Sequence, residues 1–119
     1  MTASTEPNSG LKYGWDRGES GWDTENDANL LTIGRVLSQC SILDRDLTAP
    51  PGGESDGDRY IVAATATGAW ASHEDDIAVY TGSGWAFYTP VQGWLTYIED
   101  EAKISVFKTA TGWSAGVSI

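Results

Sequence analysis

The chain has very few of the residues that hold metals or form disulfides. Its 119 residues include one cysteine, Cys40, and one histidine, His73. A single cysteine excludes an intrachain disulfide framework, and the two residues together are too few for a zinc site of the Cys/His type. We therefore expect a fold that is stabilised by packing alone and that has no metal or other cofactor.

Basic residues and long apolar runs are also scarce. Seventeen acidic residues against seven basic ones give a net charge of −10, which repels a phosphate backbone. No apolar run approaches the about 20 residues of a membrane span, and the start of the chain lacks the order of a secretory signal. We expect no nucleic-acid or membrane partner, and a chain that stays in the cytoplasm until it is assembled.

Catalytic patterns are missing as well. The sequence contains neither a nucleophile elbow nor a glycine-rich phosphate loop, and His73 lies in an expected loop. Acidic runs occur at Asp56-Gly57-Asp58, Glu74-Asp75-Asp76 and Glu99-Asp100-Glu101, but none completes a calcium-binding loop pattern. We predict that these are solvated turns and that the chain is not an enzyme.

The first 23 residues contain large aromatic side chains among many glycines. Glycines at positions 10, 14, 18 and 21 interrupt any regular period, so we expect an extended arm over residues 1–23. Tyr13, Trp15 and Trp22 lie on this arm. Because large aromatic surfaces rarely remain in water, we predict that these three residues anchor the arm to protein.

A helical pattern follows the arm. Thr24 and Asp27 resemble a capping box, which predicts a helix over residues 24–40. Its apolar residues recur at spacings of 3, 4 and 3 and form one stripe: Leu30, Ile33, Leu37 and Cys40. Burial of this stripe is expected, and two partners remain open, the sheet of the same chain and further copies of the helix.

The remainder of the chain has the pattern of short strands. Residues 41–58 are expected to form a connector, because two prolines and two glycines at 50–53 oppose helix and central strand. Beyond it, β-branched and aromatic runs predict strands at 60–63, 77–80, 85–88, 94–98 and 103–107. We therefore predict a mainly β fold with one N-terminal helix, in which residues 59–119 form a small antiparallel meander or barrel of hairpins.

Tryptophans in the predicted hairpins have two interpretations. Trp85, Trp94 and Trp113 each follow a glycine, and packing across a hairpin explains tryptophans at such positions. Aromatic rings on a sheet also stack sugar rings, which makes the chain a candidate carbohydrate-binding module. The candidate stacking residues are Trp70, Trp85, Trp94 and Trp113.

One long stretch resembles a known family. The run SILDRDLTAPP from Ser41 to Pro51, then DGDRYIVA and TGAW, is similar to a domain family of unknown function found in bacteriophage and prophage tail proteins and in gene transfer agents. Ahead of it, LKYGWDRGESGW and DANLL resemble the N-terminal attachment segment of such proteins. The order of IAVY, GWAFYTP and GWLTYI behind it is also similar.

This resemblance implies a structural component of the virion, made in the host cytoplasm and commonly placed at the particle-proximal end of a tail fibre or spike. Its expected partners are other virion proteins and further copies of the chain, with a homotrimer favoured. Because the chain ends at Ile119, an adaptor or capsid decoration protein is expected rather than a long fibre. A host-surface glycan is the partner that the alternative interpretation requires. No catalytic residues come with the resemblance.

Overall fold

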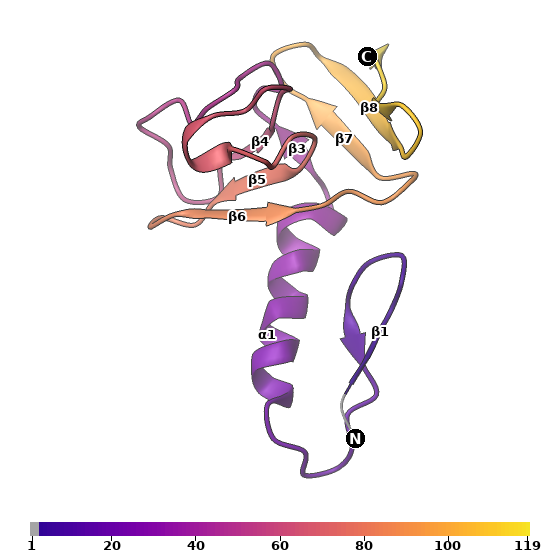
Figure 1. Cartoon of the computed structure of the whole chain (residues 1–119). Coiled ribbons are helices and arrows are strands. Elements are labelled where there is room, and N and C mark those ends of the chain that lie inside the picture. Colours follow the sequence, from indigo (N-terminus) through magenta and orange to yellow (C-terminus); the bar gives the residue numbers. More distant parts are fainter. Residues whose placement is uncertain (1–2) are drawn as a thin grey trace. The chain divides into compact units, whose positions relative to one another are not determined.

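The computed structural model describes residues 3–119, and the chain divides into two compact units, Met1–Gln39 and Cys40–Ile119. Figure 1 shows a helix in the first unit and several small sheets in the second. This arrangement confirms the prediction of a mainly β chain with one N-terminal helix. Among residues 3–119, no helix has both the length and the apolar composition needed to cross a bilayer.

The first unit begins with a small β-hairpin, where an extended arm was expected. Strands β1 (Ser4–Thr5) and β2 (Lys12–Tyr13) pair antiparallel. Glu6 stabilises the turn between them, because its carboxylate accepts hydrogen bonds from the Ser9 hydroxyl and from the backbone amides of Ser9 and Asn8. These hydrogen bonds lower the pKa of Glu6 to about 2, and the bond from the Ser9 hydroxyl has the largest effect. Strands of two residues are too short to show a period in the sequence.

Helix α1 (Trp22–Thr32) begins two residues before the predicted start and continues as a π-helical turn, η1 (Ile33–Leu37). The N-cap is Gly21, whose φ of 87° is open to glycine at little cost, and no side chain caps the helix. The proposed capping box of Thr24 and Asp27 is therefore wrong, because both residues lie inside the helix. The regular turns end at Leu37, three residues before the predicted end at Cys40.

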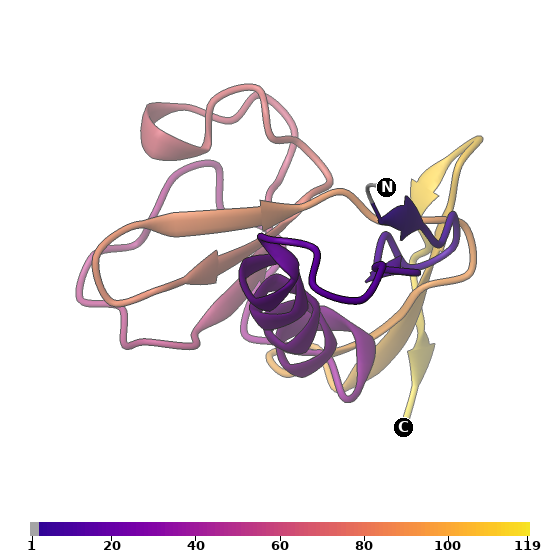
Figure 2. The same ribbon diagram turned by 90° about the horizontal axis from the view of Figure 1, so that it is seen from below.

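Side-chain hydrogen bonds fix the hairpin beside the helix. The Asn29 Oδ1 atom accepts the backbone N–H of Lys12, and its Nδ2 atom donates to the Lys12 carbonyl, both at 2.8 Å. Trp15 donates its Nε1–H to the Glu25 carboxylate at 2.7 Å. Figure 2 looks along helix α1 and shows the hairpin at its side.

The second unit contains a three-stranded antiparallel sheet in the order β4-β5-β6, which comprises β4 (Arg59–Ile61), β5 (Ile77–Tyr80) and β6 (Trp85–Tyr88). A short 3₁₀ helix, η2 (Gly68–Trp70), lies between β4 and β5 in the chain. Its Trp70 is fully buried in a cluster with Tyr60, Val62 and Ala78. Apolar burial of this kind is the main favourable term for so small a unit.

A second sheet has the order β10-β8-β7-β3. Its strands are β3 (Ser41–Ile42), β7 (Leu95–Ile98), β8 (Lys103–Lys108) and β10 (Val117–Ser118), and β9 (Gly112–Trp113) pairs with one end of β8. Strand β3 runs parallel to β7, so the pairing is not purely antiparallel, and the expected connector over residues 41–58 in fact starts with a strand. A parallel bridge between Asp44 and Tyr60 joins the two sheets, and residues 3–119 form no closed barrel.

Candidate functional site

The expected anchoring residues of the N-terminal unit lie in different environments. Tyr13 and Trp22 are exposed, with Trp22 as the first residue of α1. Trp15 is half-buried and hydrogen-bonded to Glu25, so it secures the chain to its own helix. Of the three rings, those of Tyr13 and Trp22 therefore present the larger surfaces to a partner.

The apolar stripe of the helix is largely uncovered in the single chain. Leu30 is 59% exposed and Ile33 39%, while Leu37 is half-buried. With Trp22, these residues fall within about a quarter of the helix circumference at 100° per residue. Cys40 belongs to the second unit, where burial raises the pKa of its thiol to about 11. The stripe Trp22, Leu30, Ile33 and Leu37 is called the helix stripe below.

Of the four candidate stacking tryptophans, Trp70 lies in the core of the second unit and the half-buried Trp85 packs against it. Trp70 is 0% exposed, so its ring offers no face to a sugar. Its centroid lies 5.2 Å from that of Trp85, in an edge-to-face arrangement, and Tyr60 and Tyr80 also contact Trp85 edge-on. This packing explains the two rings as parts of a hydrophobic cluster.

The other two tryptophans are half-buried at the β7–β8–β9 end of the unit. Trp113 donates its Nε1–H to the Asp75 carbonyl at 2.9 Å and packs edge-on against Phe107. Trp94 lies in the turn before β7, where its backbone bonds Val91 and Phe107. Partial exposure leaves both rings with some surface, but each is tied to neighbouring residues.

His73, the single histidine, lies in the turn before β5. Its ring stacks on Phe87 with centroids 3.6 Å apart, and its Nδ1 atom lies 3.0 Å from the Asp76 carboxylate. The nearest groups are thus an aromatic face and a carboxylate of its own turn. No nucleophilic side chain is bonded to this histidine among residues 3–119.

Arg45 ties together three segments that are distant in the sequence. Its guanidinium forms a bidentate pair with Glu101, with N···O distances of 2.9 and 2.8 Å. It also donates to the carbonyls of Ser114 and Ala115, both at 2.7 Å. The Arg45 hydrogen bonds hold the pKa of Glu101 below its usual range and raise that of Arg45. The SILDRDL segment is therefore a structural junction, which its Pro/Gly-rich neighbourhood did not indicate.

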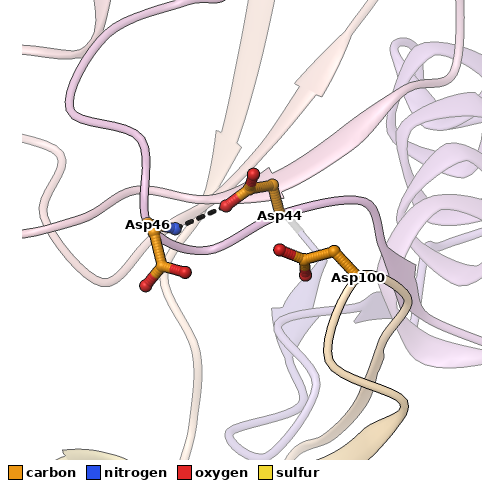
Figure 3. Close-up of side chains that lie close together, drawn as sticks. All are labelled: Asp44, Asp46 and Asp100. Carbon is orange, nitrogen blue, oxygen red and sulfur yellow. Dashed lines mark hydrogen bonds between the residues drawn. The ribbon is translucent and has the colours of Figure 1, made fainter.

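An acidic cluster lies beside this junction. Carboxylate oxygens of Asp44, Asp46 and Asp100 come within 4.8 Å of one another. Figure 3 shows the three side chains, with the Asp46 backbone amide donating to Asp44. Partial burial raises the pKa of Asp100, and the neighbouring carboxylates raise it further by a smaller amount. Oxygen ligands at this spacing could hold a hard divalent cation. Acidic side chains also cluster without one, so the arrangement alone assigns no metal.

The sheet that contains β7 and β8 has an apolar face turned to solvent. Leu95, Tyr97, Ile104 and Val117 are 39–71% exposed, whereas Thr96 and Ser105, which point to the other side, are at most 2% exposed. The register places Tyr97 opposite Ile104 and Ile104 opposite Val117. Leu95 lies opposite Val106, which is half-buried. These five apolar residues are called the outward face below. The sequence predicted these strands but not which of their faces would be covered.

Comparison with known proteins identifies the part of the chain that carries these features. A family model described as a protein of unknown function, DUF2793, matches residues 26–114. The match includes most of helix α1 and every strand from β3 to β9. No curated protein matches the chain.

Proposed function

The chain belongs to the DUF2793 family, and on this basis we propose that it is a non-catalytic structural subunit of a phage-type particle that acts through protein–protein assembly. The SILDRDLTAPP, DGDRYIVA and TGAW segments support a phage-type setting through their resemblance to tail proteins and gene transfer agents. A tail fibre or spike, an adaptor or a capsid decoration component are the particle parts that fit such a subunit.

The observation that carries this proposal is the uncovered helix stripe. Large apolar side chains that a chain cannot bury by itself mark sites of protein contact. Trp22, Leu30 and Ile33 are exposed along one side of a short helix, and two hydrogen bonds from Asn29 join that helix to the hairpin. Other virion proteins or further copies of the chain, with a trimer favoured, are the proposed partners of this stripe.

The carbohydrate-binding alternative has less support. It needs accessible aromatic platforms, and Trp70 is enclosed while Trp85 packs against it. Trp94 and Trp113 keep partial exposure. Binding on a glycan array that is abolished by Trp94→Ala or Trp113→Ala would favour this alternative.

A matched pair of leucines provides the test of assembly. Leu30 lies on the helix stripe, and Leu31, similarly exposed at 49% against 59%, is turned about 100° around the helix. Leu30→Glu is expected to reduce incorporation into particles at least about tenfold, because it puts a charge into an apolar contact. Leu31→Glu is the control and is expected to incorporate normally. Normal incorporation of both variants would overturn the proposal.

A further inference from the structure

The outward side of the β7–β8 pair is apolar, unlike the outward side of a sheet that faces water. In such a sheet the outward positions are polar and the inward positions apolar. Here the outward pairs Leu95–Val106 and Tyr97–Ile104 are apolar, while the inward side contains the buried Ile98 as well as the pair Thr96–Ser105. The outward face is therefore apolar surface that a single copy leaves in water, which is typical of a protein contact.

The apolar residues of this face are contiguous. Val117, Ile104 and Tyr97 form a row across three neighbouring strands, and Leu95 with Val106 forms a second row beside it. Strands are spaced about 4.8 Å apart, so side chains within a row touch their neighbours. Contiguous exposed apolar patches of this kind are commonly functional.

Opposite charges lie at the two ends of the outward face. Glu99 follows β7, and its carboxylate accepts a hydrogen bond at 2.6 Å from the Ser41 hydroxyl; Ser41 lies opposite Tyr97 on this side of the sheet. Lys108 ends β8 two residues beyond Val106, which places it on the same side but at the other end of the strand pair. Both residues are exposed.

The opposite charges at the two ends of the outward face favour a second copy of the chain as its partner. We propose that the outward face is a two-fold interface with a second copy of this chain. A two-fold axis that lies in the plane of the contact, perpendicular to β7 and β8, reverses the strand direction of the second copy, so that the Lys108 side chain of each copy meets the Glu99 side chain of the other. A parallel arrangement around a three-fold axis would instead bring like charges to the same level, at both ends of the face.

The inference goes beyond the proposed function, because it concerns two copies of the purified chain and holds whether or not the chain is part of a particle. It also uses residues other than the helix stripe. Since the apolar centre is small beside the about 800 Å² that each partner contributes to a standard interface, the expected dissociation constant is micromolar, on the order of 1–100 µM.

The first test is the mass of the full chain in solution, measured by sedimentation from about 1 to 500 µM, a range that brackets the expected constant. Ile104→Glu puts a charge into the centre of the row and is expected to weaken association at least about 100-fold, so that the mass of the associated species halves. Ala110→Glu adds the same charge at an exposed turn outside the face and is the control. A wild-type chain that remains monomeric throughout, or an associated mass unchanged by Ile104→Glu, overturns the inference.

Charge-reversal variants at the two ends of the outward face distinguish the two-fold arrangement from other arrangements of the two copies. Lys108→Glu and Glu99→Lys are each expected to weaken association about five- to tenfold, because each places like charges together, and the double variant is expected to recover it. Both sites are exposed, but Glu99→Lys also removes the hydrogen bond from Ser41, so urea denaturation of each variant checks that it is folded. Absence of recovery in the double variant overturns the two-fold arrangement.

Discussion

Tyr97 lies directly opposite Ile104 across strands β7 and β8, and both side chains remain 39% exposed. Their chain neighbours Thr96 and Ser105 also lie opposite each other, but on the covered side of the sheet. One pair of strands thus puts two hydroxyls on the covered side, beside the buried Ile98, and large apolar groups on the exposed side. This relationship leaves apolar surface that the single chain does not cover.

The buried hydroxyl of Thr96 provides a stability test. Its Oγ1 atom has no hydrogen-bond partner within the described chain, which leaves a buried polar group uncompensated. Thr96→Val keeps the shape of the side chain and removes this group, so the free energy of unfolding is expected to rise by about 1 kcal/mol. Urea denaturation of the full chain measures it.

Ser105 is the matched control for that prediction, since it faces Thr96 but is satisfied. It donates to the Ser114 carbonyl at 2.7 Å and accepts from Arg45 at 3.3 Å. Ser105→Ala is expected to lower the free energy of unfolding by about 1–2 kcal/mol. If the two substitutions change stability in the same direction, the assignment of the two hydroxyls is wrong.

Arg45 is predicted to be the most sensitive polar residue of the second unit. Arg45→Ala leaves Glu101 and two carbonyls without their donor and is expected to cost about 2–3 kcal/mol of unfolding free energy. Arg45→Lys keeps the charge but not the planar fork, so we expect a loss of about 1–2 kcal/mol. A Lys variant as stable as the natural chain would show that charge alone matters.

The pH dependence of this junction has a defined direction. Because the pKa of Glu101 is lowered on folding, its pairing with Arg45 stabilises the fold above the ordinary glutamate pKa of 4.5, and this contribution is lost as the pH falls through the folded value. The stability difference between the natural chain and Glu101→Gln is therefore expected at pH 7 and is expected to diminish below about pH 4. Thermal unfolding at both pH values measures it, and a difference that persists unchanged in acid would contradict the assignment.

Asp100 is expected to behave in the opposite way. Its pKa is raised, so its charged form disfavours the fold; this cost is absent below the ordinary aspartate pKa of 3.8 and grows as the pH rises through the folded value. Asp100→Asn is expected to stabilise the chain at pH 7 by a few tenths of a kcal/mol after solvent screening, and to have no effect near pH 3. Destabilisation at pH 7 would show that the Asp100 carboxylate makes a favourable contact.

Much of the second unit could be predicted from the sequence. Strands at 77–80 and 85–88 agree with the structure, and those at 94–98 and 103–107 differ by one residue at an end. Short runs of β-branched and aromatic residues carry enough information to locate such strands. The predicted strand at 60–63 corresponds to β4, which is shifted towards Arg59.

Features that depend on long-range contacts could not be predicted. Strand β3 has two residues and exists because the parallel partner β7 lies more than 50 positions later. Asp44 and Asp100 meet for the same reason. The helix starts after a positive φ angle at Gly21, whereas the sequence predicted a side-chain cap at Thr24. The predicted strands corresponding to β7 and β8 did not indicate which of their faces the fold would bury.

Quantification of the chain in purified particles tests the proposed function most directly. Particles from cells that express the chain are separated on a density gradient, and the chain is measured against the major capsid protein by mass spectrometry. The account predicts a fixed number of copies per particle that persists through repeated purification. Recovery of the chain entirely in the soluble fraction, with none bound to particles, would contradict it.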